Sequence, residues 1–447
     1  NYFSAFSRMP SENDMFYGTI QRGLDFWSSS FFCGSAAVLR RAHLMEVGGL
    51  SGDSITEDAE TAFDLHALGY ESVYVDRPMV SGLAPETFDA FVTQRMRWAQ
   101  GMTQILLLKK PFMERQLSWH QRIGYMSSIL FWLFPFARII FLLMPPAYLV
   151  FDLQVYHASM ADIFAYTVPH VMATYMLSTM LFGKTRWPLV SELYEILQCI
   201  FTLRALMRVF RNPRAPSFVV TPKGENLTRT FISPLSGVFY SLLILVTVAM
   251  AAGIFKMIYE PLTRELTAVV LAWNCFNFIL LISVLGVLVE RKQVREQARL
   301  PANDEVSLVD ADGKAWPGHL MDLSLGGARA QIAGDLSALQ NQVSLRTQRE
   351  GDIEPVLLPA SILDVSPQRQ QVRIQFKRDT QYIGNVIRFV LGDSRRWQSF
   401  QRRRTRPISY WFGVKHVVSV SISPAIQHFY LQSRRLWRKL RTAKEGT

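Results

Sequence analysis

The chain has 447 residues, of which 49% are hydrophobic and 19% charged, and its mean hydropathy is slightly positive. It is too apolar for an ordinary soluble enzyme and too charged for a protein wholly in lipid, so we expect at least one part to lie in a bilayer. Three cysteines are too few and too far apart for a disulfide framework or a four-ligand zinc site.

The net charge of +12 is concentrated at the C-terminus. Residues 394–447 hold thirteen Lys or Arg and one acid, so the rest of the chain is neutral overall. Basic residues cluster in QRRRTRP (401–407) and in RRLWRKLR (434–441), where aromatic and aliphatic residues lie between them. A phosphate-binding surface and an amphipathic segment on an anionic leaflet are both open, and the second is favoured. Nucleic acid is not an expected partner.

The chain opens without Met on irregular sequence typical of the middle of a domain, so we expect further sequence upstream. Residues 31–108 alternate β-rich runs such as SVYVD (72–76) with helical stretches such as EDAETAFDLHALG (57–69). We therefore assign residues 1–115 to a soluble α/β domain.

Residues 116–289 are predicted to be a transmembrane region. Four apolar stretches are long enough to span a bilayer, and these are residues 123–151, 161–183, 231–258 and 262–288. Basic residues in the loop 184–229 and after the last span place both soluble parts in the cytoplasm. Arg138, inside the first span, either lines a polar channel or reaches the membrane surface.

The loop between the second and third spans contains a further helical pattern over residues 189–210. Its apolar spacing and separated charges predict a helix in the membrane interface, and a fifth span is the alternative.

After residue 299, short alternating runs separated by turn residues predict a small all-β barrel. We assign residues 290–392 to this domain, with a closing helix over residues 380–391, and residues 393–447 to the basic amphipathic tail.

Asp58 is the candidate general base. It follows a glycine-rich loop at the predicted start of a helix, where a carboxylate is positioned to accept a proton from a hydroxyl. Taken alone, the sequence Thr56, Glu57 and Asp58 is more often an ordinary helix N-terminus.

Two other clusters lie on either side of Asp58 in the sequence. Gln94, Arg97 and Trp98 share one helical face and offer an amide, a cation for a diphosphate and an aromatic plane for a sugar. Cys33 and Gly34 in FFCGS (31–35) have small side chains that allow close approach of a chain.

Together with the spans that follow, these motifs resemble the processive family 2 membrane glycosyltransferases, most closely the bacterial cellulose synthase catalytic subunits. FVVTPKG (218–224) resembles the FxVTxK gating loop of that family, which we place at residues 211–230. The resemblance implies a GT-A-like fold and an inverting, UDP-forming transferase that adds glucose from UDP-glucose to the non-reducing end of a β-1,4-glucan.

The resemblance also implies the role of each motif. Asp58 would be the base, with Thr56 and Glu57 beside it, and Gln94, Arg97 and Trp98 would bind acceptor and diphosphate. The channel mouth would be formed by Phe32, Cys33, Gly34 and Ser35, and the gating loop would act through Phe218, Val220, Thr221 and Lys223.

The aspartate motifs that hold uridine and Mg²⁺ in this family are absent from the 447 residues. We therefore expect a C-terminal portion of a longer subunit, with Mg²⁺ held elsewhere and no metal ligands here. The implied partners are UDP-glucose, the nascent glucan, inner-membrane lipid and a periplasmic regulatory subunit.

The barrel region resembles a PilZ domain, which binds cyclic di-GMP through RxxxR and DxSxxG motifs. Arg295, Arg299, Asp322, Ser324 and Gly327 match these motifs, with Gly327 expected to permit a tight turn. Guanidinium groups suit a doubly charged dinucleotide, because they bind phosphate through two bonds and stack on guanine. Arg291 with Arg295 is the other possible register.

We expect the dinucleotide to activate the enzyme by drawing an arginine away from an acidic partner, for which Glu86 is the candidate. The alternative functions are a non-catalytic cyclic di-GMP receptor and channel, and a synthase of another β-linked polysaccharide.

Overall fold

The computed structural model describes most of the chain between residues 12 and 433. The described residues are 12–34, 36–77, 79–80, 82, 84–154, 160–183, 185–187, 189–216, 218–225, 227–293, 299–348, 355–377, 379–393, 395–396, 398, 411–412, 415, 418, 422 and 425–433. The chain folds into two compact units, one formed by Asn1–Asp76, Gly82–Gln293 and Thr405–Thr447 and the other by Arg77–Ser81 and Val294–Arg404.

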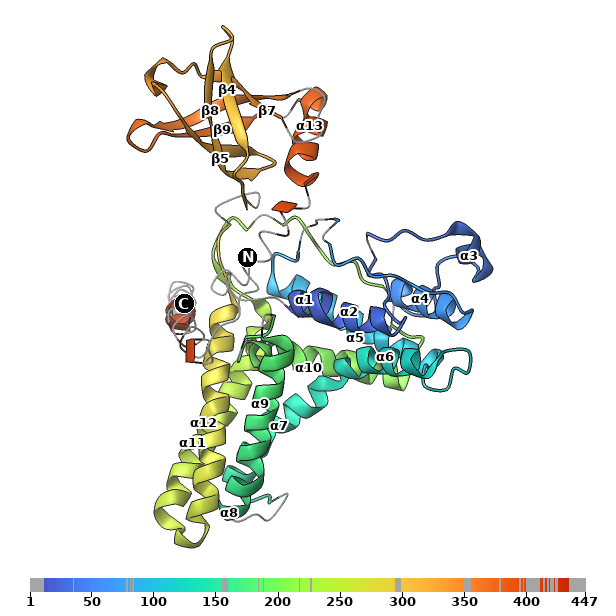
Figure 1. The fold of residues 1–447 in the computed structure, drawn as a ribbon. Helices are drawn as coiled ribbons and strands as arrows, with labels where there is room; N and C mark the ends of the chain where they lie inside the picture. The colour runs from blue at the N-terminus through green and yellow to red at the C-terminus, as the bar shows by residue number, and fades with distance from the viewer. Residues whose placement is uncertain are drawn as a thin grey trace, which may run out of the picture. The chain divides into compact units, whose positions relative to one another are not determined.

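The first unit begins with short helices and continues into the long helix α5 (Figure 1). These elements are α1 (Glu12–Met15), a π-helix (Phe16–Ile20), α2 (Gln21–Phe26), α3 (Arg41–Glu46), α4 (Glu57–Ala67) and α5 (Phe88–Leu108). Thr87 caps α5, since its side chain accepts a hydrogen bond from the Ala90 amide at 3.2 Å. The predicted strand at residues 72–76 is not formed, and the Tyr74 amide donates to Asp25 Oδ1.

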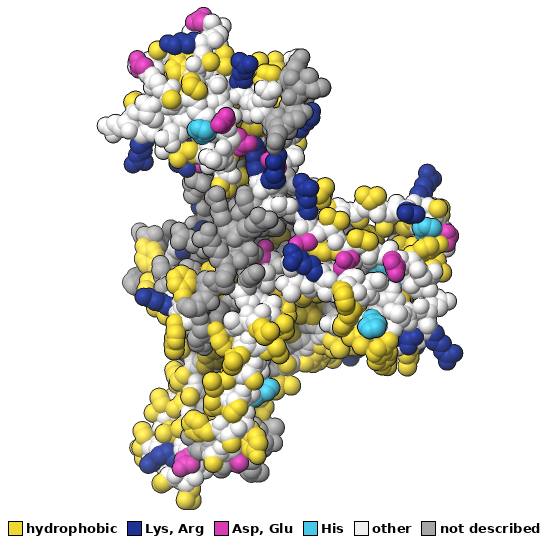
Figure 2. Space-filling model, viewed as in Figure 1, with side chains coloured by type: hydrophobic (Ala, Val, Ile, Leu, Met, Phe, Trp, Pro, Cys, Tyr) yellow, Lys and Arg dark blue, Asp and Glu magenta, His cyan; other side chains and the backbone are white. Residues whose placement is uncertain are grey.

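Three helical stretches of the described chain are long and apolar enough to cross a membrane, namely Trp119–Phe151, Pro234–Tyr259 and Pro261–Val287. They coincide with three of the four predicted spans. Their elements are α6 (Trp119–Leu130), a 3₁₀ turn (Phe131–Leu133), α7 (Phe134–Phe151), a 3₁₀ turn (Pro234–Ser236), α11 (Gly237–Tyr259), a 3₁₀ turn (Pro261–Thr263) and α12 (Arg264–Val287). Figure 2 shows hydrophobic side chains over most of the visible face of this helical region.

The remaining predicted span, residues 161–183, is also helical. It comprises α8 (Met160–Asp162), a π-helix (Ile163–Thr167) and α9 (Val168–Phe182). Asp162, Pro169 and His170 lower its hydropathy, so its passage through a membrane stays a prediction.

The predicted interfacial helix is α10 (Val190–Arg211), which packs against α5 and α7. In Figure 1 it runs across the direction of α11 and α12. Arg138 of α7 forms an ion pair with Glu195 of α10, with Nε and Oε2 2.8 Å apart. This pairing joins a charge in the first span to a charge on the crossing helix, so neither is left unpaired in an apolar environment.

A two-stranded sheet pairs the chain that follows the predicted gating loop with the chain that follows α12. It pairs β1 (Phe231–Ile232) with β2 (Val289–Glu290) in antiparallel register, Phe231 opposite Glu290 and Ile232 opposite Val289.

The second unit contains the predicted β-barrel. Its strands are β3 (Leu300–Pro301), β4 (Glu305–Asp310), β5 (Ala315–Ser324), β6 (Gly327–Ile332), β7 (Gln342–Thr347), β8 (Val356–Ser366) and β9 (Gln371–Phe376), with 3₁₀ turns at Leu336–Ala338 and Pro367–Arg369. The order β5-β4-β7-β8-β9-β6 closes through the pairing of β5 with β6, so six strands form a barrel. The predicted closing helix is α13 (Thr380–Leu391), whose Val386, Phe389 and Val390 belong to the barrel core.

Candidate active site

Asp58 lies in the first turn of α4, on the wall of a cavity. Its Oδ1 accepts a hydrogen bond from the Ala59 amide at 2.8 Å, and it forms no ion pair with a Lys or Arg of the described chain. Burial raises the pKa of Asp58 to about 6, with Glu57 adding to the shift and the Ala59 amide and Arg97 opposing it. Such a carboxylate is ionised at neutral pH and basic enough to accept a proton.

The backbone of the FFCGS segment lies against Asp58. Gly34 has φ +70°, and a Cβ at this position would lie 3.6 Å from Asp58 Oδ2. The segment is held by Gln21, whose Nε2 donates to Phe31 O at 2.9 Å and to Cys33 Sγ at 3.5 Å. Burial raises the pKa of the Cys33 thiol to about 12, so Cys33 stays protonated and is not a nucleophile.

Helix α5 positions the loop that precedes Asp58. Gly101 packs so tightly on this loop that a Cβ there would lie 2.4 Å from two side-chain atoms of Thr56. Gln104 accepts a hydrogen bond from the Ile55 amide at 2.9 Å and donates to Pro213 O at 2.8 Å. The buried side-chain amide of Gln104 therefore joins this loop to the chain that follows α10. The position of Gln104 in the sequence did not indicate this role.

Trp98 lines the same cavity as Asp58. Its ring packs edge-on against Trp132, with centroids 6.4 Å apart, and the Arg95 guanidinium lies 4.7 Å from its centroid. Arg95 is also buried, lines the cavity and donates to Asn13 Oδ1 at 3.3 Å. Arg95 was missed in the sequence, although it lies within the QRMRW motif.

Arg97 faces the predicted gating loop and is not among the residues that line the cavity. Its guanidinium lies 4.5 Å from the centroid of Phe218, and its Nη1 donates to Val219 O at 3.4 Å. The QRMRW motif and the gating loop, more than 100 residues apart in sequence, are therefore in contact.

Other gating-loop residues differ in burial. Val220 is exposed and Lys223 lies on the surface, whereas Thr221 is buried and its hydroxyl has no partner in the described chain. The Gly224 amide donates to Glu86 Oε1 at 3.0 Å. Glu86 Oε2 is buried and has no partner among the described residues, so Glu86 holds the loop through one oxygen only.

The cavity has a volume of about 500 Å³. Asp58 and Trp98 lie in its wall with Thr56 and Cys33, and α6, α7, α9 and α10 supply much of the remainder. Its walls are rich in aromatic side chains, which are Phe16, Tyr17, Phe31, Trp98, Phe131, Trp132, Phe134, Phe182, Trp187 and Tyr194. A long molecule with apolar faces and scattered hydroxyls suits such walls.

The predicted residues are thus only partly gathered around one cavity. Thr56, Asp58, Cys33 and Trp98 line it. The other described residues predicted for catalysis, substrate binding or gating do not, and these are Phe32, Gly34, Glu57, Gln94, Arg97, Phe218, Val220, Thr221 and Lys223. Ser35 lies outside the described residues.

In the barrel, Asp322 of β5 is held between two arginines. Its Oδ1 lies 2.9 Å from Arg299 Nη1, and its Oδ2 lies 2.7 Å from Arg329 Nη2. Arg329 lies opposite Asp322 in the pairing of β5 with β6, a position that the DxSxxG pattern did not indicate. Arg295 lies outside the described residues, so the register of the RxxxR motif stays open.

Ser324 and Gly327, the last two defined residues of the DxSxxG motif, contact each other directly. The Ser324 hydroxyl donates to Gly327 O at 3.0 Å. A Cβ at Gly327 would lie 2.1 Å from Ile374 O, and its φ is not positive. Glycine is therefore needed here for close packing on β9, not for the tight turn that the sequence suggested.

No group of three or more His, Cys, Asp or Glu side chains in the described chain is arranged to hold a metal ion. Both basic tail segments, residues 401–407 and 434–441, also lie outside the described residues. Residues 425–433 are helical, and His428 Nε2 lies 2.5 Å from the Tyr240 hydroxyl of α11.

Comparison with protein families identifies two matching regions. Residues 3–182 match "Glycosyl transferase family group 2" and residues 293–392 match "PilZ domain". The order of the two domains is the order that the motifs predicted.

Curated relatives match most of the chain. A "Cellulose synthase catalytic subunit [UDP-forming]" of Pseudomonas fluorescens is 35% identical over 349 residues, which are 77% of this chain and 47% of that protein. "Cellulose synthase 1 catalytic subunit [UDP-forming]" of Komagataeibacter xylinus is 32% identical over 395 residues, which are 87% of this chain and 53% of that protein. The chain thus spans about half the length of these relatives.

Among solved structures, the "PilZ domain of CeSA from cellulose synthesizing bacterium" is 31% identical to this chain. The match covers 21% of this chain and 96% of that one, with a TM-score of 0.19.

Proposed function

We propose that this chain, which is homologous over most of its length to bacterial cellulose synthase catalytic subunits, forms the part of a UDP-forming synthase that deprotonates the acceptor and exports the product. The substrate is UDP-glucose, and the acceptor is the non-reducing end of a β-1,4-glucan. In this proposal the family 2 glycosyltransferase region carries out the transfer reaction, and the PilZ domain regulates it.

The observation that supports this function most strongly is the environment of Asp58. Its carboxylate lies in the wall of an aromatic cavity that Trp98 also lines, and burial raises its pKa to about 6. An inverting transfer needs one base of this kind, because only the acceptor hydroxyl has to lose a proton.

In the proposed reaction, Asp58 accepts the proton of the acceptor 4-hydroxyl. The hydroxyl oxygen forms the new bond to the anomeric carbon as the bond from that carbon to the UDP oxygen breaks, which inverts the configuration. UDP leaves as the anion and needs no proton. Trp98 supports the acceptor sugar by stacking on its apolar face, since indole rings offer such a surface.

The lining of the cavity supports the coupling of synthesis to export, because it combines the proposed base with residues of the helical region. Its wall includes Asp58 and Trp98 together with Phe182 of α9 and with Trp187 and Tyr194, the last in α10. We propose that the glucan leaves through the spanning helices of a bacterial inner membrane, with both soluble parts on the cytoplasmic side.

Cyclic di-GMP is the proposed activator, bound by the barrel. Asp322 already holds the guanidinium groups of Arg299 and Arg329 in place, and a dinucleotide phosphate can replace or join this carboxylate. Ser324 and Gly327 shape the adjacent backbone.

The remaining partners are proposed from homology. Family 2 glycosyltransferases usually use a divalent metal to neutralise the leaving diphosphate, and we propose Mg²⁺, although the described residues offer no ligand set for it. Inner-membrane lipid and a periplasmic regulatory subunit complete the proposed assembly.

The test is incorporation of labelled UDP-glucose by the full-length protein in membranes, with and without cyclic di-GMP, followed by cellulase digestion. We expect an insoluble product that cellulase removes and whose yield rises with the dinucleotide. No insoluble product would favour a non-catalytic receptor, and a cellulase-resistant product would mean another polysaccharide.

A further inference from the structure

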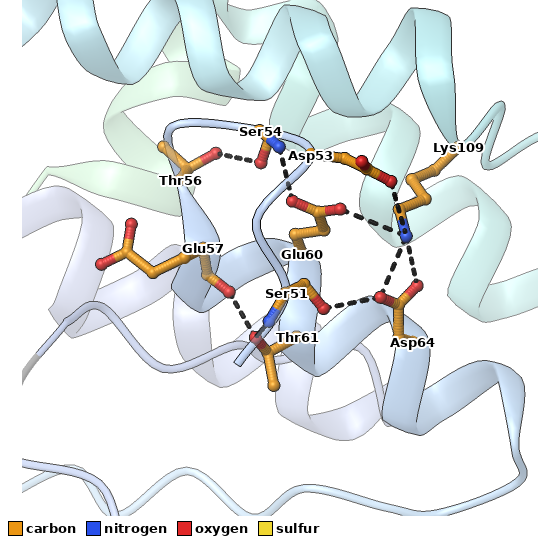
Figure 3. A network of polar contacts seen from close by, with 9 residues as sticks. All are labelled: Ser51, Asp53, Ser54, Thr56, Glu57, Glu60, Thr61, Asp64 and Lys109. Carbon is orange, nitrogen blue, oxygen red and sulfur yellow. Dashed lines mark hydrogen bonds and ion pairs between the residues drawn. The ribbon is translucent and has the colours of Figure 1, made fainter. Parts of the chain in front are cut away.

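A lysine at the end of α5 lies among three carboxylates (Figure 3). Lys109 Nζ is 3.0 Å from both carboxylate oxygens of Asp64, 3.1 Å from Glu60 Oε1 and 3.7 Å from Asp53 Oδ2. Asp53 is 61% exposed, so its contribution to the cluster is small.

Glu60 depends most on this lysine, because its side chain is fully buried. Its Oε2 accepts a hydrogen bond from the Ser54 amide at 2.7 Å, and its Oε1 has Lys109 as its partner. A buried carboxylate that loses its cation keeps the cost of desolvation and either takes up a proton or moves toward water.

The two carboxylates held by Lys109 fix both ends of the loop before Asp58. Glu60 binds the Ser54 amide, and Asp64 Oδ2 accepts a hydrogen bond from Ser51 Oγ at 2.7 Å. The Ser51 amide donates to Thr61 Oγ1 at 2.9 Å, which adds a third tie between this loop and α4. Figure 3 shows the loop folded over α4 with these groups beneath it.

The loop leads directly to the proposed base. Ile55 is bonded to Gln104 and Thr56 packs on Gly101, so α5 contacts this segment at two points besides Lys109. Lys109 itself does not line the cavity and is not among the groups that shift the pKa of Asp58, so its influence on Asp58 is expected through the position of the backbone.

We propose that Lys109 is a positioning residue for the transfer reaction, because it neutralises Glu60 and Asp64 and so holds residues 51–56 in the conformation that presents Asp58 to the acceptor. This inference rests on the proposed function of Asp58. Its effect is expected in kcat and not in sugar-nucleotide affinity, since a misplaced base slows proton transfer without removing a contact to UDP-glucose.

The test compares Lys109→Met with Lys109→Arg in the full-length protein in membranes, with Lys110→Met as the control. Lys110 follows directly and is exposed. We expect Lys109→Met to lower kcat by about 10- to 100-fold with little change in KM for UDP-glucose. Lys109→Arg should recover most of the loss, and Lys110→Met should resemble the wild type.

Hydrogen exchange of the peptide that covers residues 50–57 is measured on the same proteins. We expect faster exchange in Lys109→Met only, and slow exchange in Lys109→Arg. Ser51→Ala, which removes a single hydrogen bond of the loop, should have a smaller effect in the same direction and serves if Lys109→Met fails to fold.

The kinetic measurement and the hydrogen-exchange measurement together separate this inference from the proposed function. An inactive wild-type protein would refute the transferase assignment, and hydrogen exchange alone would then decide whether Lys109 holds the loop. Wild-type kcat or unchanged exchange in a folded Lys109→Met protein would overturn the inference, as would a KM that rises in step with the loss of activity.

Discussion

Asp58 in the glycosyltransferase region and Asp322 in the barrel are both partly buried aspartates in predicted motifs, yet their surroundings differ. Asp58 forms no ion pair in the described chain, and burial raises its pKa to about 6. Asp322 has an arginine at hydrogen-bonding distance from each of its oxygens.

This difference matches the two proposed roles. A general base must stay basic enough to take a proton, which an adjacent arginine would prevent by stabilising the anion. An aspartate at a dinucleotide site has another task, because it holds guanidinium groups in place until a phosphate arrives.

The largest expected effect is that of Asp58→Asn. The amide cannot accept the acceptor proton, so kcat should fall by about 10²- to 10⁴-fold. Labelled UDP-glucose incorporation by membranes measures this, with the exposed Glu71→Gln as control. Wild-type activity in Asp58→Asn would show that Asp58 is not the base and would remove the contrast with Asp322.

A smaller effect is expected in the barrel from Arg299→Ala. Losing one charge-assisted phosphate contact should raise the Kd for cyclic di-GMP by about 10- to 100-fold. Equilibrium binding to the full-length protein measures the change, and the exposed Arg369→Ala should bind as the wild type does. Unchanged affinity in Arg299→Ala would place the dinucleotide elsewhere.

The smallest effect concerns Glu290, a buried acid outside the spans that shares with Asp58 a raised pKa. Its Oε1 accepts a hydrogen bond from the Phe88 amide at 2.6 Å, and burial raises its pKa to about 7. Because the folded-state pKa lies above that of an unfolded glutamate, about 4.3, Glu290 stabilises the fold at low pH and progressively less as pH rises to about 7.

Glu290→Gln removes this titration but keeps an acceptor for Phe88. The wild-type melting temperature should therefore fall by a few degrees more than that of the variant between pH 5 and pH 8. Thermal unfolding followed by tryptophan fluorescence measures how the melting temperature of each protein changes with pH. Glu71→Gln should show the same change of melting temperature with pH as the wild type. An equal fall in melting temperature between pH 5 and pH 8 in Glu290→Gln and the wild type would mean that Glu290 does not titrate in this range.

The sequence predicted the barrel well because its determinants are local. In β7 and β9 buried residues alternate with more exposed ones, as the period of a strand requires. The helix over residues 380–391 was predicted with the bounds of α13, since Asp379 caps its start and Gly392 follows its end.

The active-site region was predicted less completely because its ties join distant segments. Asp58 was recognisable from a local pattern, an acid at a helix start after a glycine-rich loop. The partners of Gln104 and Lys109 are 45 or more residues away, and neither residue belongs to a motif. Arg329 was missed for a related reason, since only strand pairing brings it to Asp322.

The pH dependence of kcat/KM for glucose transfer by the full-length protein tests the central claim most directly. Because Asp58 must be ionised to act as base, we predict an acid limb with a midpoint near pH 6, below which kcat/KM falls about tenfold per pH unit. A constant kcat/KM between pH 5 and pH 8, or an acid limb with its midpoint near pH 4, would contradict the assignment of Asp58 as a buried general base.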